Sequence, residues 1–166
     1  TGDGSLATIL MRLRPDLRIE GVDVMPRPEV HIPVTIYDGK TLAFADKSFD
    51  YVTIVDVLHH TDDPAEVLTE AVRVARMRVV IKDHLGEGLL AGPTLRFMDW
   101  VGNWGHGVRL PYNYYSRDQW QGAFYKARLT TLSNKERLGL YAAPFSWFFE
   151  RKLHFVALLA PRARTA

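Results

Sequence analysis

Apolar residues along the chain follow two periodicities in turn, one typical of helices and the other typical of buried strands. The first helical pattern places four apolar residues on one face: Leu6, Ile9, Leu10 and Leu13. Ser5 fits the N-cap of this helix, and Pro15 ends it because the residue before a proline avoids helical geometry. The pattern therefore predicts a helix over residues 5–13.

Three apolar segments that follow predict strands, at residues 18–24, 31–39 and 49–60. The last is the strongest, because β-branched residues occupy it almost without interruption between Val52 and Val57. Continuous rather than alternating apolarity predicts a strand that is covered on both faces, as in a parallel sheet.

The segment over residues 62–76 predicts a helix with clear signals at its start. Asp63 fits the N-cap, Pro64 the first helical position and Glu66 the reciprocal position of a capping box. Its apolar residues form one face: Val67, Leu68, Ala71, Val72 and Ala75. A further buried strand is predicted over residues 78–83.

The pattern changes after residue 85. Residues 88–104 favour a helix, and a second capping box, Ser116 with Gln119, predicts the start of another. Three residues of that second helix are expected to face inward: Trp120, Ala123 and Phe124. Residues 128–134 and 153–160 then predict two closing strands.

Alternating strands and helices predict an α/β fold. We expect a doubly wound, mostly parallel Rossmann-like sheet that closes with an antiparallel C-terminal strand pair. A length of 166 residues fits a single domain over residues 1–166.

Composition narrows the choice of function. An apolar fraction of 47% and a charged fraction of 24% are ordinary for a globular protein. A net charge of +2 gives no general attraction to nucleic acid, and no apolar run approaches the roughly 18 residues of a membrane span. The absence of cysteine excludes disulfides and thiolate metal sites and fits a cytoplasmic protein. We expect no nucleic-acid partner and no membrane span.

Ligands of such sheets bind beyond the carboxyl ends of the strands, and three turns there carry suitable residues. The loop that starts with Thr1 and Gly2 lets backbone approach a ligand. Asp23 closes one predicted strand and has the spacing of an acid that holds a ribose diol. Asp38 offers an acceptor for an exocyclic amine, and Gly39 leaves room for a flat ring. The alternatives are a plain glycine turn, a surface aspartate and an Asp-Gly turn.

These spacings occur together with the segment LAFADKSFDYVTIVDVLHHTDDP, and with them the chain resembles the class I S-adenosylmethionine-dependent methyltransferases. TGDG resembles the end of the family's glycine loop, and Asp23 and YDG resemble the acids after its second and third strands. LAFADKSFD and VLHHTDDP are similar to the family's L-P-F-x-D-x-S-F-D and L-H-H-x-x-D-P motifs, with Ala43 in place of the usual proline. The resemblance implies S-adenosylmethionine as cofactor and methyl transfer as activity.

The resemblance also implies a role for each matching position. Thr1 and Gly2 would contact the methionine part of the cofactor, and Asp23 would hold the ribose hydroxyls. Val55 would pass close to the amino-acid end of the cofactor, and Leu42 would cover the edge of the adenine. Four more residues would surround the adenine: Val24, Met25, Asp38 and Gly39.

One departure from the family concerns the start of the chain. The family's first strand and first loop glycines would precede Thr1, and in the family that strand lies in the middle of the sheet. Each buried amide left without its partner costs about 1–3 kcal/mol, against a net stability of about 5–15 kcal/mol. We therefore expect an N-terminally truncated fragment, marginal or unfolded by itself.

Two histidines are candidates for catalysis. His60 and His84 follow predicted strands on the ligand side, where an imidazole can take a proton from the methyl acceptor. The alternative is that they only pack and form hydrogen bonds, because an activated sulfonium needs little beyond alignment with its acceptor. His59, His60, Asp56 and Asp83 are of the types that bind zinc, but no ligand spacing on a helix supports a site, and we expect no metal.

Aromatic residues are frequent between residues 97 and 125. In the family, insertions after the fifth strand form the acceptor pocket, so the resemblance implies that residues 86–125 form it here. Tyr112, Tyr114 and Tyr115 are the candidates for contact with the acceptor, which we expect to be a small molecule. The alternative is that these side chains fill the core beneath a long loop.

Two other functions remain open at this stage. An NAD(P)-dependent oxidoreductase of the short-chain type would also suit Asp23, although the Tyr-x-x-x-Lys pair of that class is missing at Tyr112 and Tyr125. A catalytically inactive, truncated binding module is the third hypothesis, and the incomplete glycine loop is its evidence.

Overall fold

The computed structural model of the chain describes residues 1–104 and 110–162. The chain divides into two compact units, Thr1–Phe44 and Ala45–Ala166. The predicted α/β class is confirmed, since helices combine with parallel and antiparallel strand pairs. No helix within the described ranges is long and apolar enough to cross a membrane.

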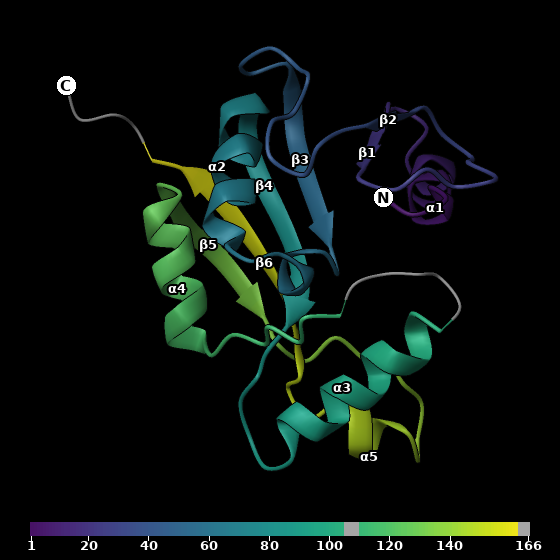
Figure 1. The fold of residues 1–166 in the computed structure, drawn as a ribbon, viewed down its shortest axis with the longest axis vertical. Helices are drawn as coiled ribbons and strands as arrows, with labels where there is room; N and C mark the ends of the chain where they lie inside the picture. The colour runs from purple at the N-terminus through teal and green to yellow at the C-terminus, as the bar shows by residue number, and fades with distance from the viewer. Residues whose placement is uncertain (105–109, 163–166) are drawn as a thin grey trace. The chain divides into compact units, whose positions relative to one another are not determined.

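The first unit contains one helix and a small parallel sheet (Figure 1). Helix α1 spans Ser5–Leu13, and β1 (Gly21–Asp23) pairs in parallel with β2 (Val34–Ile36). Both strands are shorter than the apolar segments indicate, because only three residue pairs are in register, ending with Asp23 opposite Ile36. The loops that follow the two strands therefore start at the same edge of the sheet.

The start of α1 differs from the prediction by one position. The N-cap is Gly4 at a φ of 82°, and Ser5 is the first helical residue. Asp3 accepts hydrogen bonds from the backbone N–H of Ser5 at 2.9 Å and from its hydroxyl at 2.8 Å. Glycine is needed at position 4 because a Cβ there would lie 2.6 Å from Cγ1 of Ile32. Asp3, rather than Ser5, thus supplies the acceptor at this helix end.

The second unit is built on a four-stranded sheet (Figure 1). Its strands, in spatial order, are β3 (Phe49–Val55), β4 (Ala75–His84), β6 (His154–Pro161) and β5 (Leu129–Lys135). β3 and β4 are parallel, and β6 runs antiparallel to both of its neighbours. The two predicted closing strands therefore pair with each other, as expected.

One prediction about β3 is wrong, because the strand is not covered on both faces. Ile54 is buried, but Tyr51 is 52% and Val55 37% exposed. The reason is position: β3 lies at the edge of its sheet, and its apolar run reflects β-branched composition rather than two buried faces.

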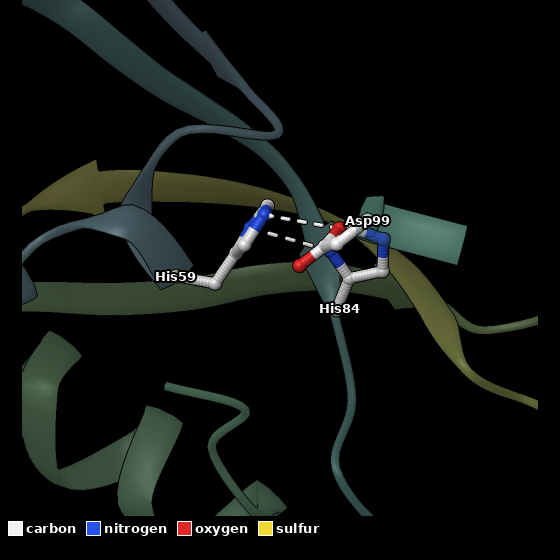
Figure 2. A group of neighbouring side chains, drawn as sticks. All are labelled: His59, His84 and Asp99. Carbon is white, nitrogen blue, oxygen red and sulfur yellow. Dashed lines mark hydrogen bonds and ion pairs between the residues drawn. The ribbon is translucent and has the colours of Figure 1, made fainter. Parts of the chain in front are cut away.

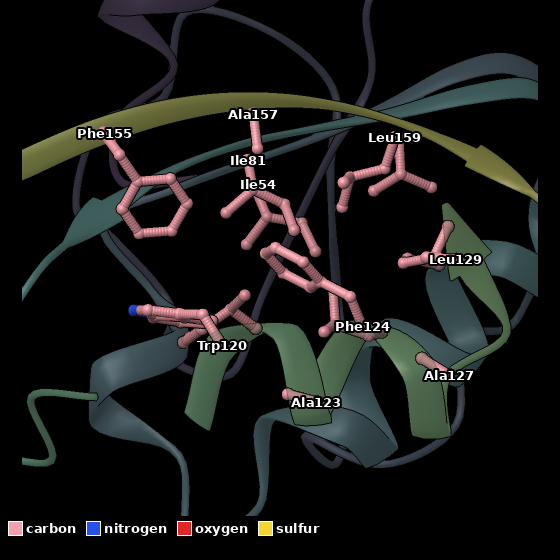
Figure 3. Packing of buried hydrophobic residues seen from close by; sticks show 14 of the residues in the cluster. Ile54, Ile81, Trp120, Ala123, Phe124, Ala127, Leu129, Phe155, Ala157 and Leu159 are labelled. Carbon is pink, nitrogen blue, oxygen red and sulfur yellow. The ribbon is translucent and has the colours of Figure 1, made fainter. Parts of the chain in front are cut away.

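Two helices cover one face of this sheet and form the core with it (Figure 3). α2 spans Pro64–Val74 and α4 spans Arg117–Lys126. The cluster joins α4 to the strands through large side chains (Figure 3): Trp120, Phe124, Ile54, Ile81, Phe155 and Leu159. The inward orientation predicted for Trp120, Ala123 and Phe124 is confirmed. Three shorter elements complete the unit: η1 (Leu58–His60), α3 (Ala91–Gly102) and α5 (Ser146–Phe149).

The two predicted capping boxes have different outcomes. At α4, the N–H of Gln119 donates to Oγ of Ser116 at 3.2 Å, and the N–H of Ser116 donates to Oε1 of Gln119 at 2.8 Å. At α2, Asp63 is the N-cap and Pro64 the first residue, but the carboxylate accepts from the N–H of Ala65 at 2.8 Å. The short Asp63 side chain accepts from the nearer N–H of Ala65 instead of from the N–H of Glu66, which the capping box would require.

Candidate functional site

The end of β1 fixes Asp23 through backbone donors from both sides. Its Oδ2 accepts from the N–H of Gly2 at 2.9 Å, and its Oδ1 accepts from the N–H of Met25 at 3.0 Å. Burial raises the pKa of Asp23, but the bonds from Met25 and Gly2 outweigh this effect, and the pKa is lowered. Thr1 ties the same loop to β1, because its hydroxyl donates to the carbonyl of Val22 at 2.6 Å. Asp23 is therefore an oriented carboxylate at neutral pH.

The turn after β2 brings the second predicted acid to the same region of the first unit. Oδ1 of Asp38 accepts from the N–H groups of Lys40 at 2.8 Å and Thr41 at 2.9 Å. Among the described residues no hydrogen bond is found for its Oδ2. The charges of Asp23 and Asp38 both act on Tyr37, whose pKa is raised first by burial and then by these two carboxylates. Both acids thus lie within electrostatic reach of one phenol.

Gly39, in the turn after β2, lies against Val24, which directly follows β1. Its φ is 81°, a conformation that favours glycine, and a Cβ there would lie 3.3 Å from Cγ1 of Val24. The Val24 side chain is exposed. Eight of the nine residues assigned to the cofactor lie in the first unit: Thr1, Gly2, Asp23, Val24, Met25, Asp38, Gly39 and Leu42. Val55, the last residue of β3, belongs to the second unit.

A buried charge network lies where β3 and β4 end in the second unit (Figure 2). His59 is 1% exposed and Asp83 is fully buried, and Nδ1 of His59 lies 2.6 Å from Oδ1 of Asp83. The other oxygen of Asp83 accepts from the N–H of Leu58 at 3.0 Å. Asp83 also accepts at Oδ1 from the backbone N–H of His84 at 2.7 Å. These donors leave the carboxylate fully partnered in a dry environment.

The network continues from His59 to helix α3. Nε2 of His59 lies 3.5 Å from Oδ1 of Asp99, whose side chain is buried. The phenol of Tyr114 donates to Oδ2 of Asp99 at 2.5 Å. Burial lowers the pKa of His59, but its hydrogen bond to Asp83 and the nearby carboxylate of Asp99 outweigh this and raise it to about 9. The result is an imidazolium between two buried carboxylates.

The two catalytic candidates lie beside this network. Nδ1 of His84 is 3.2 Å from Nδ1 of His59, and the His84 carbonyl accepts from Nε1 of Trp120 at 3.0 Å. The ring of His60 lies 3.9 Å from that of His59, tilted by 47°, and burial, followed by the charge of His59, lowers the pKa of His60. Both histidines are therefore in contact with the buried pair.

The structure groups potential metal ligands differently from the set considered on the sequence. His59, His84 and Asp99 offer ligand atoms within 4.8 Å of one another (Figure 2), as do Asp56, Asp83 and His84. His60 belongs to neither group. In both groups the side chains already bond to each other or to Lys82, whose ammonium lies 2.7 Å from both oxygens of Asp56.

A cavity of about 580 Å³ adjoins the Asp99 end of the network. It is lined by six residues: Gly86, Gly92, Pro93, Arg96, Tyr112 and Tyr114. Two of the three tyrosines predicted to contact the acceptor are thus at this cavity. The third, Tyr115, is half-buried against the hydrophobic core, with its ring 5.3 Å from that of Trp120.

Sequence reasoning missed four residues of this region. His59 and Asp83 were weighed only as metal ligands, although an aspartate that ends a buried strand beside a histidine pair is a signal for a buried ion pair. Asp99 and Arg96 carry no local signal. They lie three positions apart in α3, on neighbouring positions of one side of the helix, and only packing against Tyr112 and Tyr114 gives them their partners.

Comparisons with known proteins bear on the family and the fold of the chain. The family model described as "Methyltransferase domain" matches residues 1–80. Among curated proteins, none matches the sequence significantly.

Solved structures share the fold at low identity. A SAM-dependent methyltransferase from Aquifex aeolicus is 15% identical, over 96% of this chain and 77% of that one, with a TM-score of 0.63. The PH0226 protein from Pyrococcus horikoshii is 16% identical, over 97% of this chain and 78% of that one, with a TM-score of 0.60. LepI in complex with SAM is 16% identical, over 97% of this chain and 41% of that one, with a TM-score of 0.66.

The family match over residues 1–80 and the shared Rossmann-like fold support a class I methyltransferase domain. The family match implies methyl transfer with S-adenosylmethionine as the cofactor. The comparisons favour neither the oxidoreductase nor the inactive binding module.

Proposed function

We propose that the chain transfers the methyl group of S-adenosylmethionine to a small-molecule acceptor held in the cavity beside Tyr112 and Tyr114. The observation that carries the proposal is the anchored carboxylate of Asp23, at the edge of the sheet where this family holds its cofactor. The cavity, of about 580 Å³, has the size of a site for a small molecule.

The residues of the first unit fit an adenosine group. Oδ1 of Asp23 accepts one hydrogen bond, from Met25, and keeps a lone pair for a ribose hydroxyl. Oδ2 of Asp38 is available to the exocyclic amine of adenine. Val24 is exposed beside Gly39, where a side chain would fill the space that a flat ring needs.

The remaining assignments follow the family resemblance. Met25 would lie beside the adenine, Thr1 and Gly2 would contact the methionine part of the cofactor, and Val55 would approach its amino-acid end. When bound, S-adenosylmethionine supplies an activated methyl group on a sulfonium. The task of the protein is then to hold the acceptor in line, which requires no general base.

His60 and His84 are accordingly proposed as supporting residues. Neither lines the cavity, and both contact the buried His59. Their place in the network fits a role in holding the cavity wall more closely than direct contact with the acceptor.

Titration of S-adenosylhomocysteine and of NAD against the chain tests the proposal. We expect the first to bind and the second not to bind. Asp23→Ala should weaken S-adenosylhomocysteine binding about tenfold or more, because it removes a charged hydrogen-bond acceptor.

Asp16→Ala is the matched control for that substitution. Asp16 is an exposed aspartate that pairs with Arg14 at 2.7 Å, and its removal should change affinity less than twofold. Binding of NAD alone, or an unchanged affinity in Asp23→Ala, would contradict the proposal.

A further inference from the structure

The hydroxyl of Tyr114 has a fixed direction at the wall of the cavity. Asp99 is an ionised carboxylate and can only accept, so the phenol must donate its proton to Oδ2 of Asp99, at 2.5 Å. The phenol oxygen then has only lone pairs left for other partners. It can accept a hydrogen bond from a ligand in the cavity but cannot donate one.

The buried network prevents Asp99 from changing this role. Asp99 is 5% exposed, and its other oxygen faces the imidazolium of His59, which is held in turn by Asp83. Burial raises the pKa of Asp99, but the nearby charge of His59 and the hydrogen bond from Tyr114 outweigh it, and the pKa is lowered. Protonation of Asp99, which would release the Tyr114 hydroxyl, is therefore disfavoured at neutral pH.

A positive charge completes the cavity. The guanidinium of Arg96 lies over the Tyr112 ring, 5.5 Å from its centroid. No carboxylate within 4 Å of Arg96 is found among the residues that the structure describes. Its charge acts on the Tyr114 hydroxyl, so Arg96, Tyr112 and Tyr114 converge on one space.

Tyr112, whose ring lies against Arg96, has an unusual backbone conformation. Its φ is 58°, in the left-handed region that non-glycine residues rarely occupy. Such conformations persist where the surrounding structure imposes them, often at binding sites. The cation is thus stacked and oriented, yet its fork of N–H donors remains available to an anion.

We propose that the cavity selects an acceptor that is both anionic and a hydrogen-bond donor. Its carboxylate or phosphate would bind Arg96, and its hydroxyl or amine would donate to the oxygen of Tyr114. This inference rests on the proposed function, because it names the class of acceptor for the same cavity. The rings of Tyr112 and Tyr114 favour an acceptor with a flat ring between the two polar groups.

Matched ligands test both contacts without any mutation. Binding of 4-hydroxybenzoate, its methyl ester and 4-methoxybenzoate is measured by calorimetry in the presence of saturating S-adenosylhomocysteine. The ester lacks the negative charge and the methoxy compound lacks the donor, so each should bind about tenfold or more weakly than 4-hydroxybenzoate. A fourth ligand, 4-hydroxyphenyl phosphate, distinguishes a phosphate site from a carboxylate site by which of the two anions binds more tightly.

Variants then assign each loss to a residue. Arg96→Ala should abolish the preference for the acid over the ester, and Arg96→Lys should restore part of it. Tyr114→Phe should abolish the preference for hydroxy over methoxy. Arg76→Ala is the control, because Arg76 is an exposed arginine that pairs with Asp50, and it should leave both preferences intact.

Two sets of results separate the inference from the proposed function. If S-adenosylhomocysteine binds but the ester binds as well as the acid, or no anionic ligand binds, the acceptor class is wrong and the methyltransferase assignment stands. If S-adenosylhomocysteine does not bind, the proposed function fails first. Thermal melts of each variant show whether Tyr114→Phe remains folded, and the ligand series on the unmodified chain stands if it does not.

Discussion

Nδ1 of His59 lies 2.6 Å from Oδ1 of Asp83, and both side chains are buried. A buried pair of this kind gains little net stability over an apolar pair, but the loss of one partner leaves a charge in a dry environment. The pair also holds Asp99 in place, and Asp99 holds Tyr114 at the cavity. The same contact therefore links the stability of the second unit to the shape of its cavity.

Asp83→Asn should destabilise the chain by about 3 kcal/mol, because it leaves the His59 imidazolium with one distant carboxylate. The measurement is urea unfolding at pH 7. Asp50→Asn is the control, since Asp50 forms an exposed pair with Arg76, and it should cost less than about 1 kcal/mol. Equal losses for the two variants would show that the His59–Asp83 pair is not a buried ion pair.

Stability should also depend on pH through His59. Its pKa is raised from 6.5 to about 9 in the folded chain, so its contribution is complete below pH 6.5 and is lost as the pH rises to 9. The expected loss is on the order of 3 kcal/mol. Unfolding measured between pH 6.5 and 9 should show this decline, and His59→Gln should remove it.

Two other histidines change stability in the opposite direction, at pH values below 6.5. Burial lowers the pKa of His154 to about 3 and also lowers that of His60. Their contributions are present above pH 6.5 and are lost as the pH falls. A decline in stability that occurs only below pH 6.5 would therefore point to these residues and not to His59.

Gly86→Ala should disturb the cavity from outside the charge network. A Cβ at Gly86 would lie 2.5 Å from the carbonyl oxygen of Tyr114, so this backbone must shift. We expect a loss of about 1–3 kcal/mol and weaker binding of the acceptor, with binding of S-adenosylhomocysteine unchanged.

Gly122→Ala is the matched control for Gly86→Ala. Gly122 lies in α4 with open space around its Cβ position, and alanine there should stabilise the chain by about 0.5–1 kcal/mol. Unfolding curves and acceptor titrations of both variants provide the comparison. Unaltered acceptor affinity in Gly86→Ala would argue against a cavity shaped by Tyr114.

Local signals were sufficient to predict most elements of the fold. The capping box at Ser116, the apolar face of α2 and the apolar closing strands each depend on neighbours a few residues away. The strand β3 shows the limit of such reasoning, because its apolar run is the same whether it lies in the middle or at the edge of a sheet. Neighbours in the sheet, which decide how much of Tyr51 and Val55 is covered, are not encoded in that run.

The residues of the candidate site also differ in whether a local sequence signal marks them. The placement of Asp23 at the end of β1 and of Asp38 in the turn after β2 could be predicted, because strand and turn residues mark both positions locally. The pairs His59–Asp83 and Asp99–Tyr114 join residues 24 and 15 positions apart. No local pattern places them together, because their contact depends on how β4 and α3 meet the loop before α4.

Two serines give a last test of helix starts, because the sequence suggests an N-cap at both. Ser116→Ala should cost about 1 kcal/mol, since it removes the acceptor for the N–H of Gln119 and opens the capping box of α4. Ser5→Ala should cost only a few tenths of a kcal/mol, because Ser5 lies inside α1 and Asp3 still accepts from its backbone N–H. Thermal unfolding of both variants makes the comparison, and a larger loss for Ser5→Ala would return the N-cap of α1 to Ser5.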